Sequence, residues 1–191
     1  MSRRLLNRHA PRRRPVISLV ALTFALTSAG TPAQTKPKAD ITVVADADGV
    51  HAGATARLAV RASLPAGIHV QSNAPRDPFL IATAVTVPAT PGVSVVETVY
   101  PPATDFTQVG QSSPLAVFEQ QFVIGLKLAI ARGTAVGELS VPIRVRYQAC
   151  NATTCFAPTT EALQLSLRVV PESVKTTAQL TDVFDALRFH R

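Results

Sequence analysis

The chain has 191 residues, of which 47% are hydrophobic and 16% charged, and its formal net charge at neutral pH is +7. The positive charge is concentrated near the N-terminus, and the rest of the chain has no basic and aromatic pattern typical of nucleic-acid binding. The sequence also lacks a glycine-rich phosphate loop, a nucleophile elbow and the helix motif of metalloproteases, which argues against these enzyme classes.

The N-terminal segment has the layout of a secretory signal peptide, which we assign to residues 1–29. An uncharged, mainly apolar run from Val16 to Leu26 follows six arginines: Arg3, Arg4, Arg8, Arg12, Arg13 and Arg14. Small residues come next, and cleavage is expected after Ala29 or Ala33. An uncleaved anchor is the alternative, but the run is shorter than the roughly 20 residues that span a bilayer. Loss of the six arginines lowers the net charge from +7 to +1, and no stable membrane span is expected after cleavage.

About 160 residues then remain, enough for one domain with a hydrophobic core. Residues 30–40 show no apolar periodicity and are expected to be a flexible leader. Alternating apolar and polar residues predict strands over 40–45, 55–64, 68–70, 79–87, 93–100, 118–130, 136–147 and 163–169. Between Pro102 and Phe118 the chain shows no clear period, and we expect an ordered excursion or a mobile loop there.

Short strands separated by turns predict an all-β fold, a two-sheet antiparallel sandwich over residues 41–171. A helical period appears only near the C-terminus, where apolar residues fall at i, i+3, i+4 and i+7: Leu180, Val183, Phe184 and Leu187. Residues 172–191 are therefore expected to form a tail with a short helix that packs on the sandwich or on a partner.

The only two cysteines, Cys150 and Cys155, lie between the predicted strands that end at Tyr147 and begin at Leu163. Export places them in an oxidising compartment, where an intramolecular disulfide is the default expectation. A bridge across so short a loop constrains the unfolded chain by only about 2 kcal/mol. Such a bridge is a weak stabiliser, which favours a functional role.

Other candidate site residues are open to two interpretations. A metal site could combine both cysteines with His51, His69 or His190, but the cysteine spacing is wider than in structural zinc sites. We therefore expect no metal and no cofactor, and we interpret His69 as a partly buried residue at a strand end. Asp105 and Glu119 flank the excursion, where they either tune a nearby thiol or are solvated loop charges.

Five segments occur in an order that points to a known family. They are Gly67–Pro75, Phe79–Thr83, Val99–Pro102, Leu115–Glu119 and Tyr147–Pro158. Together they resemble the N-terminal periplasmic domain of the thiol:disulfide interchange protein DsbD, over about residues 40 to 170. The most specific part is Tyr-Gln-Ala-Cys at 147–150, with a second cysteine followed shortly by proline.

The resemblance implies an immunoglobulin-like antiparallel β-sandwich in which Cys150 and Cys155 are a redox pair and Cys155 forms the mixed disulfide. It also implies a cap loop with an aromatic ring over the pair, for which Phe106 is the candidate and Phe118 the alternative. Its partners would be thioredoxin-like periplasmic proteins or a separate membrane reductase, because no further domain follows before Arg191.

Two functions of different classes therefore follow from the sequence. The first is a periplasmic thiol–disulfide exchange protein, an electron carrier that uses the Cys150/Cys155 pair to pass reducing equivalents to thioredoxin-like partners. The second is a non-catalytic immunoglobulin-like binding or assembly module in which a local disulfide has only a structural role.

Overall fold

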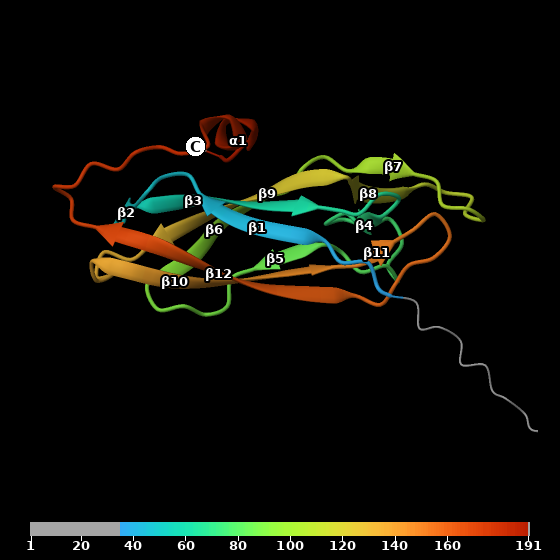
Figure 1. Cartoon of the computed structure of the whole chain (residues 1–191), viewed down its shortest axis with the longest axis horizontal. Helices are drawn as coiled ribbons and strands as arrows, with labels where there is room; N and C mark the ends of the chain where they lie inside the picture. Colours follow the sequence, from blue (N-terminus) through green and yellow to red (C-terminus); the bar gives the residue numbers. More distant parts are fainter. Residues whose placement is uncertain (1–34, 191) are drawn as a thin grey trace, which may run out of the picture. The chain divides into compact units, whose positions relative to one another are not determined.

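The computed structural model describes residues 35–190, so the predicted signal peptide and the first part of the leader lie outside the described residues. Within this range the chain forms twelve strands and one short helix (Figure 1): β1 (Asp40–Ala45), β2 (Val50–His51), β3 (Thr55–Ser63), β4 (His69–Gln71), β5 (Ala84–Thr86), β6 (Val93–Val99), β7 (Thr104–Phe106), β8 (Leu115–Glu119), β9 (Gln121–Ile130), β10 (Gly137–Tyr147), β11 (Ala149–Cys150), β12 (Thr159–Val170) and α1 (Thr181–Ala186).

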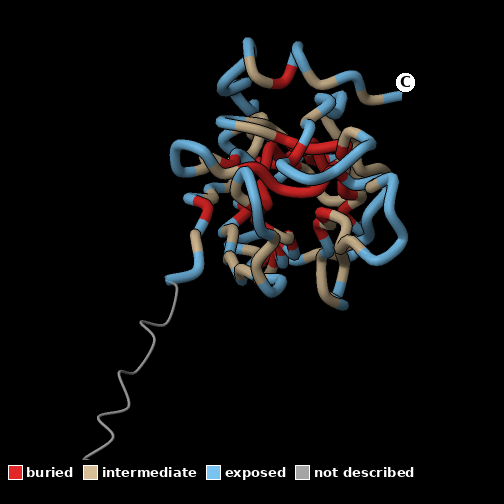
Figure 2. Tube along the Cα trace, turned by 90° about the vertical axis from the view of Figure 1, so that its right-hand side faces the viewer, coloured by how far each residue is buried: buried red, intermediate tan, exposed pale blue. Residues whose placement is uncertain are grey.

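Two four-stranded sheets pack face to face, one in the order β1-β3-β9-β6 and the other in the order β2-β12-β10-β5. Alternation along β3, β9 and β10 gives each sheet one apolar face, and Figure 2 shows the buried segments gathered in the interior. The core between the sheets includes Leu58, Val60, Ile124, Leu126, Leu128, Val141, Ile143, Val145, Leu167 and Val169. The predicted all-β antiparallel sandwich is confirmed. Among the described strands, β2 pairs in parallel with the end of β12, and the other paired strands are antiparallel.

A third sheet, β11-β4-β8-β7, continues the sandwich at one end. Strand β8 joins β9 through Gln120, whose left-handed φ of 51° turns the chain from one sheet into the next. Strand β10 joins β11 through Gln148 in the same region. Figure 1 shows β4, β7, β8 and β11 together at this end, which also holds both cysteines.

Two predicted strands differ from the structure. The strand expected over 79–87 is reduced to β5, because pairing with β10 is limited to three residues, Arg144 to Arg146. Phe79 lies in a loop instead and is 88% exposed. The strand expected over 118–130 is interrupted at Gln120, and the excursion before Phe118 contains β7 and β8, whose short paired segments left no clear period in the sequence.

The C-terminal helix is confirmed but is shorter than the apolar spacing suggests. Leu180 precedes it in a left-handed conformation and is exposed, whereas Phe184 is buried beside the Arg57 guanidinium, 5.6 Å from the ring centroid. Arg57 lies on β3, so the helix covers the outer face of the first sheet. Among residues 35–190, no helix has the length and apolar content needed to cross a membrane.

The end of the expected leader packs on the sandwich. Ala39 is buried, and its N–H donates a hydrogen bond to the Tyr147 hydroxyl at 3.0 Å. Burial raises the pKa of Tyr147, and its neutral phenol oxygen accepts this bond. Lys38 adds an ion pair with Glu161 on β12.

Candidate functional site

The two cysteines are joined by a loop that starts where β11 ends. Asn151 organises this loop, because its Oδ1 accepts hydrogen bonds from the backbone N–H groups of Thr153 and Thr154 at 2.9 and 2.8 Å. The loop folds back on itself and brings Cys155 next to Cys150. The expected disulfide is present, with the two sulfur atoms 2.06 Å apart.

The two halves of the disulfide differ in exposure. Cys150 is completely buried within β11, whereas Cys155 is only partly buried on the returning arm of the loop. Cys155 is therefore the more exposed residue of the pair, and Cys150 is covered by protein. In a thiol–disulfide exchange, this difference favours attack on the Cys155 sulfur and makes Cys150 the leaving sulfur.

Strand register places a specific group of side chains on the face of the third sheet that holds Cys150. Cys150 pairs with His69 on β4, and His69 pairs with Glu119 on β8. Directly paired residues of antiparallel strands have side chains on the same face, as do residues two positions away. Gln71 and Phe106 share this face by the same rule, since Gln71 pairs with Val117 and Phe106 with Leu115.

Gln71 contacts the disulfide directly. Its side chain is fully buried, and its Nε2 lies 3.5 Å from Cys150 Sγ and 4.0 Å from Cys155 Sγ. A disulfide sulfur carries no hydrogen and can only accept, so the amide must present its N–H group to it. The Oε1 atom is buried without a hydrogen-bond partner, an arrangement that costs about 1–3 kcal/mol.

His69 is the second buried polar residue beside Cys150. Its ring stacks on Phe106 with the centroids 4.0 Å apart, and its Nε2 atom has no hydrogen-bond partner. Burial lowers the pKa of His69, and the charge of Glu119 opposes this shift without cancelling it. His69 is therefore neutral at pH 7 and brings no positive charge to the disulfide.

The excursion between Pro102 and Phe118 lies against the cysteine loop. Gln108 is buried and donates from Nε2 to Asn151 O at 3.0 Å. The backbone N–H of Val109 donates to Ala152 O at 2.9 Å. Two hydrogen bonds thus hold this segment to the loop that carries the disulfide.

The two phenylalanines considered as cap residues occupy different environments. Phe106 is on the face that holds Cys150, and its ring covers His69. Phe118 pairs with Val70 on the opposite face and belongs to the hydrophobic core, with its ring centroid 5.0 Å from that of Phe122. Only Phe106 therefore shares a face with the cysteine.

The acidic candidates also differ. Asp105 forms an ion pair with Arg76, which in turn donates to Pro114 O at 3.0 Å. These contacts tie the loop after β4 to the excursion, so Asp105 joins two loops of the site. Glu119 accepts a hydrogen bond from the Thr104 hydroxyl at 2.9 Å and lies in the cross-strand row with His69.

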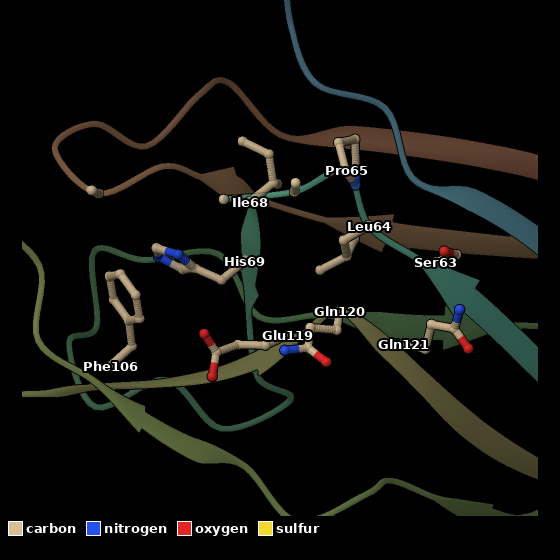
Figure 3. Close-up of a pocket in the computed structure, with 12 residues that line it drawn as sticks. Ser63, Leu64, Pro65, Ile68, His69, Phe106, Glu119, Gln120 and Gln121 are labelled. Atoms are coloured by element: carbon tan, nitrogen blue, oxygen red, sulfur yellow. The ribbon is translucent and has the colours of Figure 1, made fainter.

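A surface pocket of about 460 Å³ lies beside these groups. Figure 3 shows the rings of His69 and Phe106 side by side, with the Glu119 carboxylate below them. The remaining wall comes from the turn after β3, the start of β9 and one residue of the cysteine loop, Ala152. The pocket therefore borders the His69–Phe106 pair and the cysteine loop, but neither cysteine lines it.

No group of three or more metal-ligating side chains is found among residues 35–190. His51 and His190 are committed elsewhere in the fold: His51 Nε2 lies 2.9 Å from Val174 O, and His190 pairs with Glu97.

Sequence reasoning missed two residues of this site, Gln71 and Gln108. Gln71 belongs to a polar stretch, Gln71 to Asn73, that directly follows the predicted strand at 68–70. A glutamine at the end of a buried strand is a detectable signal, because such a side chain requires hydrogen-bond partners. Gln108 has no comparable signal, since only the folded excursion brings it to Asn151.

Fold and site together define a small all-β sandwich with a disulfide loop at one end. No protein-family model matches the chain, and no curated protein matches its sequence. Among solved structures it is similar to the N-terminal periplasmic domain of ScsB from Proteus mirabilis, with a TM-score of 0.50 and 13% identity. This match covers 70% of the chain and 49% of that structure, so the chain spans about half the length of its neighbour. The yeast GGA1 GAE domain matches at a TM-score of 0.37 and 10% identity, over 69% of the chain and 100% of that domain, a likeness too distant to show a shared fold.

Proposed function

We propose that this chain is a periplasmic thiol–disulfide exchange protein in which Cys150 and Cys155 cycle between disulfide and dithiol. The observation that carries the proposal is the unequal exposure of the two cysteines of a local disulfide, with Cys155 partly exposed and Cys150 fully buried. The sequence resemblance to the N-terminal domain of DsbD and the fold likeness to a periplasmic domain support the same function.

Exchange proceeds in two displacements. A partner thiolate attacks Cys155 Sγ, a new bond joins the partner sulfur to Cys155, and the electron pair of the old bond goes to Cys150 as a thiolate. The second thiolate of the partner then attacks the partner sulfur of the mixed disulfide and releases Cys155. The partner leaves as a disulfide, and the two protein thiolates take up two protons from solvent.

We further propose the context in which this reaction occurs. Residues 1–29 would direct export, residues 30–40 would link to the domain at 41–171, and residues 172–191 would form the tail. The partners would be thioredoxin-like periplasmic proteins, which would receive the reducing equivalents, or a separate membrane reductase, which would supply them. Phe106 would act as the cap residue, since its ring lies on the face that holds Cys150.

Trapping by single-cysteine variants tests the proposal. Cys150→Ala leaves the accessible Cys155, which should capture a thioredoxin-like protein from a periplasmic extract as a mixed disulfide. Cys155→Ala leaves the buried sulfur and should capture much less. The reduction potential of the wild-type pair should lie at roughly −120 to −270 mV, the range of exchange proteins.

The opposite result would favour the binding or assembly module. A potential below about −300 mV is typical of structural bridges. Such a value, together with no captured partner for either variant, would overturn the exchange function and leave the disulfide as a local staple.

A further inference from the structure

The Cys150 sulfur leaves as a thiolate in a place that water does not reach. Cys150 is fully buried, and burial without a compensating donor disfavours a thiolate. The proposed exchange therefore requires a group that stabilises negative charge on this atom. His69, the neighbour across the strand pair, is neutral and does not supply a cation.

We infer that Gln71 is a catalytic residue of the proposed exchange reaction, on which this inference rests. When a partner thiolate bonds to Cys155 and the Cys150–Cys155 bond breaks, the electron pair goes to Cys150 Sγ. The Nε2–H group of Gln71 donates a hydrogen bond to that sulfur as its charge develops. No proton is transferred in this step, so Gln71 acts as a donor only.

The geometry supports this role at the atoms that react. Gln71 Nε2 is nearer to Cys150 Sγ, at 3.5 Å, than to Cys155 Sγ, at 4.0 Å, so the donor is already directed to the leaving sulfur. Within residues 35–190, no other side-chain donor is within hydrogen-bond distance of either sulfur. A donor held in place before charge appears needs no reorganisation during the reaction.

The position of Gln71 is fixed by its backbone. Its N–H donates to Gln148 O at 3.2 Å, and its carbonyl accepts a hydrogen bond from the Thr83 hydroxyl. The side-chain oxygen has no hydrogen-bond partner. A buried amide with a purely structural role would normally have both its oxygen and its nitrogen hydrogen-bonded. An apolar side chain of the same length would fill the space without an unsatisfied oxygen.

Reduction by dithiothreitol tests the inference without a biological partner. Gln71→Met keeps the length of the side chain and removes the donor, and it should lower the rate of reduction on the order of tenfold, about 1.4 kcal/mol. Gln71→Leu is the second apolar variant if Gln71→Met does not fold. Quenched alkylation followed by mass spectrometry measures the rate, and circular dichroism of the oxidised variants checks their folding.

The pKa of Cys150 distinguishes a catalytic role of Gln71 from a structural one, because a Gln71 with only a structural role would not affect this pKa. In a Cys155→Ala background the remaining thiol is titrated by thiolate absorbance, and Gln71→Met should raise its pKa. Gln148→Met is the matched control, because the Gln148 amide bonds to Ile81 N and Phe156 O rather than to sulfur. The control should change the rate of reduction by less than about twofold, as a donor that does not contact the reacting atoms does not stabilise them.

The outcomes separate this inference from the proposed function. A wild-type rate and an unchanged Cys150 pKa in a folded Gln71→Met protein would overturn the role of Gln71 and leave the exchange function standing. An equal loss of rate in Gln148→Met would also overturn it. Failure of the trapping experiment would overturn the exchange function, and this inference with it, whatever the dithiothreitol rates are.

Discussion

The rings of His69 and Phe106 stack with their centroids 4.0 Å apart, on the face of the third sheet that holds Cys150. Phe106 comes from β7, at the far edge of this sheet, and His69 from β4, next to the cysteine strand. The contact spans β8, which lies between β7 and β4, and places the Phe106 ring of the excursion over His69, the neighbour of Cys150.

Loss of the Phe106 ring should open this site. We expect Phe106→Ala to raise the rate at which a small disulfide oxidises the reduced protein several-fold, because exposed thiols are oxidised more readily. Phe118→Ala is the control: it removes a core ring, should lower stability by about 3–5 kcal/mol, and should leave the oxidation rate of the folded protein unchanged. Equal rates in wild type and both variants would remove the cap role.

The buried histidine should make stability depend on pH. Burial lowers the pKa of His69 below its ordinary value of 6.5, so just below pH 6.5 the unfolded chain binds more protons than the folded one. The free energy of unfolding should therefore fall as the pH is lowered from 6.5 towards the folded pKa, and it should be fully recovered above 6.5.

His69→Phe retains a ring against Phe106 and removes the titrating group. Denaturant unfolding at several pH values between 5.5 and 7 should give a flatter profile for this variant than for wild type. Its stability at pH 7 should be equal or higher, because the unpaired Nε2 atom is lost. A profile as steep as that of wild type would show that other groups cause the pH dependence.

Two exposed apolar side chains near the disulfide should contact the partner. Phe79 is 88% exposed and Val109 is 71% exposed, and both lie on loops bonded to the cysteine end of the fold. We expect Phe79→Ser combined with Val109→Ser to lower the rate of exchange with a thioredoxin-like protein by about tenfold, since apolar anchors contribute most to such interfaces. The rate with dithiothreitol should not change.

Val136→Ser is the matched control for this surface. Val136 is also exposed, but it precedes Gly137 at the end of β10 that is remote from the cysteines. The control should exchange at the wild-type rate with both reductants. An equal effect of the control and the double variant would show that the loss is not specific to the disulfide end.

Gly125 on β9 makes room for the C-terminal tail. A Cβ atom at this position would lie 2.6 Å from the Phe189 ring and 3.2 Å from Leu187. Gly125→Ala should therefore displace the tail and lower stability by about 1–3 kcal/mol. Trypsin should cut faster after Arg188, and Gly133→Ala, where nothing lies within 4 Å, should behave like wild type. An intact tail in Gly125→Ala would mean that the strand shifts instead.

Much of the fold follows from local pattern. Strands β3, β9, β10 and β12 each have nine or more residues, and apolar residues alternate over enough of each strand to predict it and its apolar face. The short strands β5 and β7 have only three residues each, and no period can be recognised over that length. The break at Gln120 likewise depends on a contact that sequence does not show, the hydrogen bond from Leu64 N to Gln120 O.

The sequence by itself determined the sandwich and the disulfide, because alternation is a local property and the two cysteines are only five positions apart. The tertiary structure alone decided which groups surround the sulfurs. Gln71 lies 79 residues before Cys150, and Phe106 reaches the same face through the pairing of β7, β8, β4 and β11. A shift of one residue in any of these registers would turn the side chains of that strand to the opposite face, so register rather than composition assembles the site.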